Sequence, residues 1–273
     1  MSLEARWPNM RGNMAGSSQG TVRHPKGPPL VSAERRLGTW LVAVLDSSVG
    51  AKVVVALGGI GLALFAIFHM LGNLKIFQGR DALNAYAHFL KHDLGVLLWL
   101  ARAGLLGIFL LHAVFALRLK WRTASARPQP YAYPPRTTDR LAARTMALTG
   151  VLIGLFILLH LAHFTLGWVH AAEQNGQSIH YLDLKDTQGR HDVYAMVVAG
   201  FRTTWIAAIY LLAQLALFVH LIHGIPSTFQ TLGLQSRRTL GAIRGLGMLV
   251  AGIILIGNCG IVIAVWGGWV SAP

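Results

Sequence analysis

The sequence has few charged residues and one cysteine. Only 12% of the 273 residues are charged, roughly half the share in an ordinary soluble domain, and the mean hydropathy is +0.51. The single cysteine, Cys259, excludes an internal disulfide and a four-thiolate iron–sulfur site built from this chain alone. No flavin or dicarboxylate motif is present. These deficits favour a membrane protein over a soluble enzyme.

Long apolar runs take the place of the missing charge. Each of five stretches is long enough to cross about 30 Å of hydrocarbon as a helix: 52–72, 93–117, 145–168, 203–225 and 243–269. Backbone groups in lipid must bond within the segment, which leaves a helical bundle as the sensible class. The sequence therefore predicts an all-α membrane protein with five transmembrane helices, formed by residues 47–273. The last helix is rich in glycine and has no histidine, which predicts a packing role.

Residues 1–46 differ from the rest of the chain. Residues 1–39 contain proline and scattered arginine but no apolar core of the length that a secretory signal needs. Residues 31–45 predict a short amphipathic helix on the membrane surface. The alternative is that they begin the first spanning helix. We expect a cytoplasmic tail with this interfacial helix.

Acidic residues are scarce, with 10 against 24 basic ones and a formal net charge of +14. The basic residues gather in alternate connections rather than in one patch. They lie before the first span, in 118–144 (Arg118, Lys120, Arg122, Arg127, Arg136, Arg140, Arg144) and in the fourth loop (Arg237, Arg238, Arg244), whereas 70–92 and 169–202 are not strongly basic. This alternation follows the positive-inside rule. It predicts a cytoplasmic N-terminus, an outside C-terminus and no nucleic-acid partner.

Six of the twelve histidines lie in or at the ends of apolar stretches: His69, His112, His160, His163, His220 and His223. Ionisable groups inside a membrane usually mark a functional site. The predicted orientation places His69 and His160 near the outer face, and His112 and His223 near the cytoplasmic face. Two levels, each supplied by two helices, suit two haems that are each held by two axial imidazoles.

Two of the histidine groups are i, i+3 pairs, His160 with His163 and His220 with His223. The members of each pair share a helix face, and only one member of each is needed as a ligand. Spacing alone does not decide which member binds, so His163 and His220 are secondary candidates.

Two stretches, HMLGNLKIFQGRDALNAYAHFLK (69–91) and HLIHGIPSTFQTLGL (220–234), resemble a known family. The chain is similar to the single-chain, five-helix, cytochrome b558-type membrane anchor of succinate dehydrogenase and fumarate reductase, respiratory complex II. The resemblance runs from about residue 47 to the end. It implies a multi-pass subunit of the bacterial inner (plasma) membrane that docks a flavoprotein and an iron–sulfur subunit on its cytoplasmic face and passes their electrons to a quinone.

The resemblance also implies a ligand set. The family's four axial positions fall on His69, His112, His160 and His223, with His112 and His223 as one pair and His69 and His160 as the other. The family varies in haem count, so one or two b haems are expected. A Rieske-type [2Fe–2S] cluster stays open, although it normally needs two thiolates in addition to two imidazoles.

Two other functions remain open. One is a b-type cytochrome anchor of another dehydrogenase or of a hydrogenase, which would differ in its partner subunits. The other is a transporter or proton channel, which would show inverted repeats and helices broken at the midplane. No convincing repeat is present in the sequence.

Further polar residues are candidates for a cofactor or quinone site. Arg102, well inside the second span, is expected to contact a haem propionate, a quinone carbonyl or Asp93. Quinone reduction needs donors to two carbonyl oxygens and a proton source. A distal quinone site would use Asn84, Tyr86, His88 and His92, and a proximal one Ser47, Lys52 or Trp40. The Ala-, Gly- and Arg-rich composition favours menaquinone, and the loops 121–140 and 224–240 are the expected docking surfaces.

Overall fold

The structure is a computed structural model of the chain, and it describes residues 39, 42–126, 137–174 and 177–271, with the backbone alone for 137–143 and 174. Trp40 and residues 31–38 of the expected surface helix lie outside the described residues. The compact body that carries the spans begins at Leu41, a few residues before the boundary expected after residue 46.

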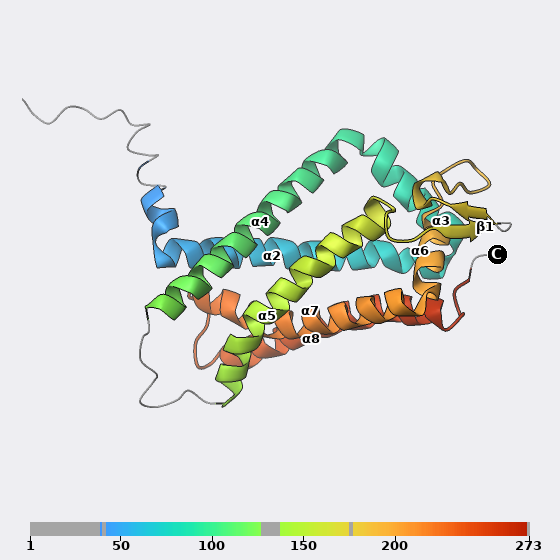
Figure 1. Cartoon of the computed structure of the whole chain (residues 1–273). Helices are drawn as coiled ribbons and strands as arrows, with labels where there is room; N and C mark the ends of the chain where they lie inside the picture. Colours follow the sequence, from blue (N-terminus) through green and yellow to red (C-terminus); the bar gives the residue numbers. More distant parts are fainter. Residues whose placement is uncertain (1–38, 40–41, 127–136, 175–176, 272–273) are drawn as a thin grey trace, which may run out of the picture. The chain divides into compact units, whose positions relative to one another are not determined.

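Within the described ranges, five helices are long and apolar enough to cross a membrane (Figure 1). They are α2 (Ser48–Asn73), α4 (Gly95–Ser125), α5 (Thr137–His160), α7 (Thr204–Thr231) and α8 (Leu240–Trp266). The tighter turn η1 (Leu74–Gln78) extends α2, and the wider turn η3 (Leu161–Thr165) extends α5. This confirms the predicted all-α class with five spans.

The first span begins at a break in the chain rather than as a continuation of the preceding helix. Residues 42–46 are helical, and Ser47 is then extended. Its Oγ accepts a hydrogen bond from the Gly50 amide at 2.9 Å, which caps α2. A Cβ at Gly50 would lie 1.9 Å from the Val44 carbonyl oxygen, so the turn needs glycine there. Residues 42–46 are therefore separate from α2, and the rest of 31–45 lies outside the described residues apart from Thr39.

The fourth span runs past its expected end. The sequence placed the end at residue 225, yet α7 continues through Pro226 to Thr231. Proline removes one backbone hydrogen bond, which neighbouring helices in a membrane bundle tolerate. Here α8 covers the proline, since a Cβ at Gly247 would lie 3.2 Å from the Pro226 Cδ. His223 is consequently inside α7 rather than at its end.

Packing is uneven around the bundle. Helices α7 and α8 lie side by side, α2 contacts α4, α7 and α8, and α5 contacts α7. Helix α4 packs mainly on α2, crosses it and diverges from it toward Gly95 (Figure 1), and none of its residues is fully buried. An apolar helix with no fully buried residue presents its surface to lipid or to a bound group.

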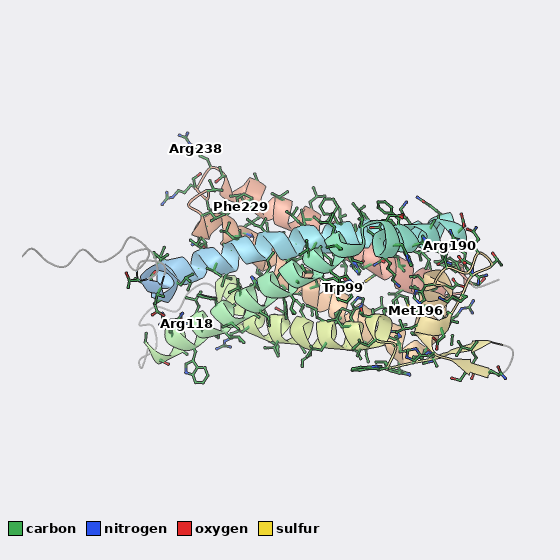
Figure 2. All side chains as sticks on the ribbon, turned by 90° about the horizontal axis from the view of Figure 1, so that it is seen from above. Trp99, Arg118, Arg190, Met196, Phe229 and Arg238 are labelled. Atoms are coloured by element: carbon green, nitrogen blue, oxygen red, sulfur yellow. The ribbon has the colours of Figure 1, made fainter. Side chains whose placement is uncertain are left out.

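Two connections at one end of the spans form what we call the end lobe. The first contains α3 (Arg80–His88) and the wide turn η2 (Phe89–Asp93); the second contains the strands β1 (Ala172–Gln174) and β2 (Gln177–Ile179), the turn η4 (Tyr181–Asp183) and α6 (Val193–Arg202). The strands pair antiparallel, and α3 packs against α6. In Figure 2, Arg190 and Met196 lie at this end of the bundle, and Arg118 and Arg238 lie toward the opposite end.

Candidate functional site

The rings of His112 and His220 face each other between α4 and α7, and we call them the α4–α7 pair. Their centroids are 6.4 Å apart and their planes meet at 68°. His112 Nδ1 lies 2.9 Å from the Val55 carbonyl oxygen. Since a carbonyl only accepts, Nδ1 must carry the proton, and Nε2 is left with a lone pair.

His220 is held in the same way. Its Nδ1 lies 3.1 Å from the Thr149 Oγ1, and that hydroxyl donates its own proton to the Thr145 carbonyl at 2.7 Å. The hydroxyl oxygen is therefore an acceptor, and His220 also carries its proton on Nδ1. Nε2 is therefore unprotonated in both rings of the pair. This is the state of a histidine metal ligand whose other nitrogen is fixed by a second partner.

Glycines on α2 and α5 make room for this pair. A Cβ at Gly58 would lie 3.1 Å from the His112 Cβ, and one at Gly59 would lie 3.4 Å from its Cε1. On the other side, a Cβ at Gly150 would lie 3.4 Å from the His220 Cε1. Small residues at such positions let helices approach closely in a membrane. Helices α2 and α5 therefore support rings that α4 and α7 supply.

The ring opposite His112 belongs to His220 and not to His223, which the resemblance had selected. His223 is half-buried one helical turn further along α7, and the ring contact with His112 is made by His220. The i, i+3 spacing left both members possible. The depth and rotation of α7 against α4 favour the first member.

The second pair, the α2–α5 pair, consists of His69 and His160. Their ring centroids are 5.8 Å apart at an interplanar angle of 88°. His69 stacks on Phe65 at 5.3 Å, and His160 Nδ1 lies 3.3 Å from the Tyr210 hydroxyl. The structure thus brings together the two histidines that the predicted depths had placed at one level.

His163 is turned away from this pair. It is 1% exposed, stacks on Phe164 at 4.0 Å, and its Nδ1 lies 2.9 Å from the Tyr210 hydroxyl. Its Nε2 is buried without a hydrogen-bond partner in the described part of the chain. That nitrogen faces α6, because a Cβ at Gly200 would lie 3.2 Å from it. With protein on both sides, His163 has packing and hydrogen-bonding contacts in this structure.

The two pairs lie at different depths along the helices. On α2, Gly59 marks the level of the α4–α7 pair, and His69 belongs to the other pair about ten residues later. At a rise of 1.5 Å per residue this separates the levels by roughly 15 Å, about half the hydrocarbon thickness. The positions of Gly150 and His160 on α5 give the same offset.

The ring separation in both pairs fits two imidazoles on one iron. A ring nitrogen binds a metal at about 2 Å, so two imidazoles on opposite sides of one ion have ring centres roughly 6 Å apart. The observed separations are 6.4 and 5.8 Å. Two imidazoles complete a porphyrin iron, whereas they supply only half the ligands of a Rieske-type cluster.

Arg102 is exposed on α4, and its guanidinium lies over the Trp99 ring at 5.0 Å from the centroid, a cation–π contact. Among the described residues it has no ion pair with Asp93. A contact with a haem propionate or a quinone carbonyl stays a prediction.

The distal quinone candidates separate into two kinds. His88 and His92 stack on each other at 4.2 Å on the end lobe, and Tyr86 packs over Gly72, where a Cβ would lie 2.7 Å from its Cε1. These three keep accessible surface. Asn84 is fully buried and its amide is already bonded, to Asp192 at 2.9 Å and to the Tyr194 amide at 3.0 Å, which makes it part of the lobe's framework.

Asn84 belongs to a buried charge network that joins the two halves of the end lobe. The Arg80 guanidinium pairs with the buried Asp192, and Arg190 pairs with Asp186 at 2.8 Å. Burial alone would raise the pKa of the Asp192 carboxyl, but the hydrogen bonds from Arg80 and Asn84 outweigh burial and lower it. The pKa of Asp186 is lowered against burial in the same way, chiefly by Arg190.

The proximal quinone candidates lie at the opposite end of α2. Ser47 uses its hydroxyl to cap α2 and to donate to the Val44 carbonyl at 2.7 Å, and Lys52 is exposed. Beside them Asp46 pairs with Arg118, which lowers the pKa of that carboxyl. This ion pair ties the segment before α2 to the end of α4.

Several residues that shape the site were not predicted from the sequence. They are the Val55 carbonyl, Thr149, the glycines at 58, 59 and 150, and above all Tyr210. Tyr210 interrupts the apolar run IAAIYLLAQ of the fourth span, and such an isolated hydroxyl was the available signal. A backbone carbonyl carries no such signal.

No model of a known protein family, no curated protein and no solved structure matches this chain. The likeness to complex II anchors therefore rests on the two quoted motifs, and the arrangement of the site rests on the geometry above.

Proposed function

We propose that this chain is the membrane anchor and quinone-reactive electron-transfer subunit of a succinate:quinone oxidoreductase, with one haem b held by each histidine pair. The observation that carries the proposal is the α4–α7 pair. Its two imidazoles come from two helices, both have an unprotonated Nε2, and their ring centroids lie 6.4 Å apart. The two motifs at 69–91 and 220–234 support the choice of family.

In this proposal each haem supplies a one-electron carrier. The protein's own part is to fix the rings: the Val55 carbonyl and the Thr149 hydroxyl hold the α4–α7 rings, and Tyr210 holds His160. Two carriers about half a hydrocarbon thickness apart would connect the two faces of the membrane. The chain supplies no dicarboxylate chemistry, so succinate would react on a docked flavoprotein.

Charge supports the assignment of faces. The end of α4 carries Arg118 and Arg122, and the loop after α7 carries Arg237 and Arg238, all at the end opposite the lobe. Under the positive-inside rule this is the cytoplasmic end, where the flavoprotein and iron–sulfur subunits would dock. The end lobe with His88 and His92 would then lie outside, beside the α2–α5 pair, which favours a quinone site on that side.

The experiment is a dithionite-reduced minus oxidised optical spectrum of the complex purified from its native membrane, with a pyridine haemochrome count and identification of the co-purifying subunits. We expect two b haems for each chain and a flavoprotein among the partners. A haem-free complex would remove the haem proposal. Two haems with a hydrogenase or another dehydrogenase would instead support the second candidate, an anchor of a different enzyme, for which the same histidine geometry would serve.

A further inference from the structure

Tyr210 lies between His160, at the end of α5, and His163 in η3. Its hydroxyl lies 3.3 Å from the Nδ1 of His160 and 2.9 Å from the Nδ1 of His163. The side chain is 5% exposed, and its ring packs edge-on against Phe156 and Phe201, with both centroids at 4.9 Å. A phenol held this firmly cannot turn away from either imidazole.

The direction of the hydrogen bonds follows from the chemistry of His160. A neutral imidazole that binds a metal through Nε2 carries its proton on Nδ1. That N–H can only donate, so the Tyr210 oxygen accepts from it. The phenol proton then goes to His163 Nδ1, and the proton of His163 lies on Nε2, the buried nitrogen without a partner. The result is one directed chain, His160 N–H to Tyr210 O–H to His163 N.

This chain explains two costs in the structure. A buried polar nitrogen without a partner is unfavourable, and a π-type turn directly after His160, in η3, is rare in proteins and frequent at functional sites. The turn sets the direction of His163, and Gly200 of α6 leaves room for its ring. Both features serve to place an acceptor behind Tyr210.

We infer that Tyr210, oriented by His163, is a positioning residue that sets the redox potential of the centre held by His160. The inference rests on the proposed function, since it concerns a haem bound at this pair. An acceptor on the Nδ1–H of a ligating histidine makes the ring a stronger donor to the metal, which favours the oxidised state and lowers the potential. His163 strengthens this effect because it draws the phenol proton away from the oxygen.

The α2–α5 pair depends on Tyr210 more than the other pair depends on any one side chain. Across the described residues, the ring nitrogens of His69 have no hydrogen-bond partner, and its recorded contacts are the rings of Phe65 and His160. In the α4–α7 pair both rings have an acceptor, and one of these is a backbone carbonyl. Removal of the Tyr210 hydroxyl should therefore shift the midpoint potential of one centre and leave that of the other unchanged.

The test is a potentiometric titration of both haems in the purified complex, with electron paramagnetic resonance of the oxidised form. In Tyr210→Phe we expect the midpoint potential of one centre to rise, that of the second to stay at the wild-type value, and the haem count to be unchanged. The matched control is Tyr194→Phe, which removes an end-lobe hydroxyl that donates to the Ser271 carbonyl at 3.1 Å and lies away from both histidine pairs. It should move neither potential.

His163→Leu keeps the phenol and removes its acceptor, so it should raise the same midpoint by a smaller amount. Wild-type potentials in Tyr210→Phe with both haems retained would overturn the inference, as would equal shifts of both centres. If Tyr210→Phe loses its haem, the His163→Leu variant provides the test instead. An unchanged midpoint potential in His163→Leu would also overturn the inference. Absence of haem in the wild-type complex is a different result, because it rejects the proposed function itself.

Discussion

The two histidine pairs share three helices, α2, α5 and α7, whose roles differ between the two depths. In the α4–α7 pair, α4 and α7 supply the rings, and α2 and α5 supply the partners and the glycine space. In the α2–α5 pair, α2 and α5 supply the rings, and α7 supplies the hydroxyl that holds one of them. Helices α2, α5 and α7 thus each supply a ring at one depth and a support at the other, because sites about ten residues apart on a helix face different neighbours.

The pairs differ in how firmly their rings are held. Both rings of the α4–α7 pair have their Nδ1 fixed by helix-bound acceptors. In the α2–α5 pair only His160 is fixed, through a side chain that also contacts His163. The second pair lies toward the end lobe, whose α6 packs against His163 through Gly200. The properties of a site that is supported by side chains and a lobe can be tuned by substitution. A ring that is fixed by a backbone carbonyl resists such tuning.

The largest effect is expected when one histidine ligand is removed at each level. His112→Ala and His69→Ala should each remove one of the two haems and leave the other, because each iron needs both of its imidazoles. The measurement is the haemochrome count with the reduced-minus-oxidised spectrum. If both variants abolish the same single signal, the two-level arrangement is wrong.

A second test separates the two members of the α7 histidine pair. His220→Ala should remove the same haem as His112→Ala, whereas His223→Ala should retain both haems, since His220 is the ring that faces His112. The optical spectra of the two variants decide the matter. Loss of haem in His223→Ala with retention in His220→Ala would support the assignment that the family resemblance implied.

A smaller effect, on stability, is expected from substitutions in the end lobe. Arg80→Ala leaves the buried Asp192 carboxylate without its charged partner but with the Asn84 amide in place, so we expect a loss of about 2 kcal/mol of stability. Thermal unfolding in detergent measures it, with the exposed Arg237→Ala at the opposite end as the control. The optical spectrum of the α2–α5 centre should change more than that of the other. Equal stability of the two variants would contradict a structural role for the network.

The same network predicts a dependence on pH. The pKa values of Asp186 and Asp192 are lowered in the folded protein, so both carboxylates stabilise the lobe fully above about pH 4, their ordinary range. That stability is lost as the pH falls through the lowered values. Hydrogen exchange of α3 and α6 between pH 7 and 3 should show it, and Asp192→Asn should reduce the dependence. An identical profile in that variant would contradict the assignment.

The smallest expected effect concerns Gly200. A Cβ there would lie 3.0 Å from the His163 Cε1, so Gly200→Ala must move the ring by a few tenths of an ångström, at a cost of about 1 kcal/mol. Gly104→Ala, where no atom lies within 4 Å of the added Cβ, is the control. Only the electron paramagnetic resonance signal of the α2–α5 centre should shift. A shift in the signal of the α4–α7 centre would show that the two levels are coupled more closely than the contacts indicate.

Much of the fold followed from the sequence, because apolar length and the cost of unbonded backbone in lipid leave few choices. The five spans were predicted from these two facts, with errors confined to their ends. The fourth span runs past residue 225 because α8 packs on Pro226 through Gly247, a contact that the sequence of neither helix shows alone. The expected boundary after residue 46 lies next to Ser47, which caps α2.

The candidate site was predicted less completely. The sequence by itself determined which histidines lie at membrane depth and that they form two levels, since depth follows from position along a spanning helix. Only the tertiary structure decided that His220 rather than His223 faces His112, that His163 is enclosed behind Tyr210, and that Asn84 belongs to the lobe. These outcomes depend on how each helix is rotated about its axis, and rotation is set by contacts with neighbouring helices that spacing within one helix does not encode.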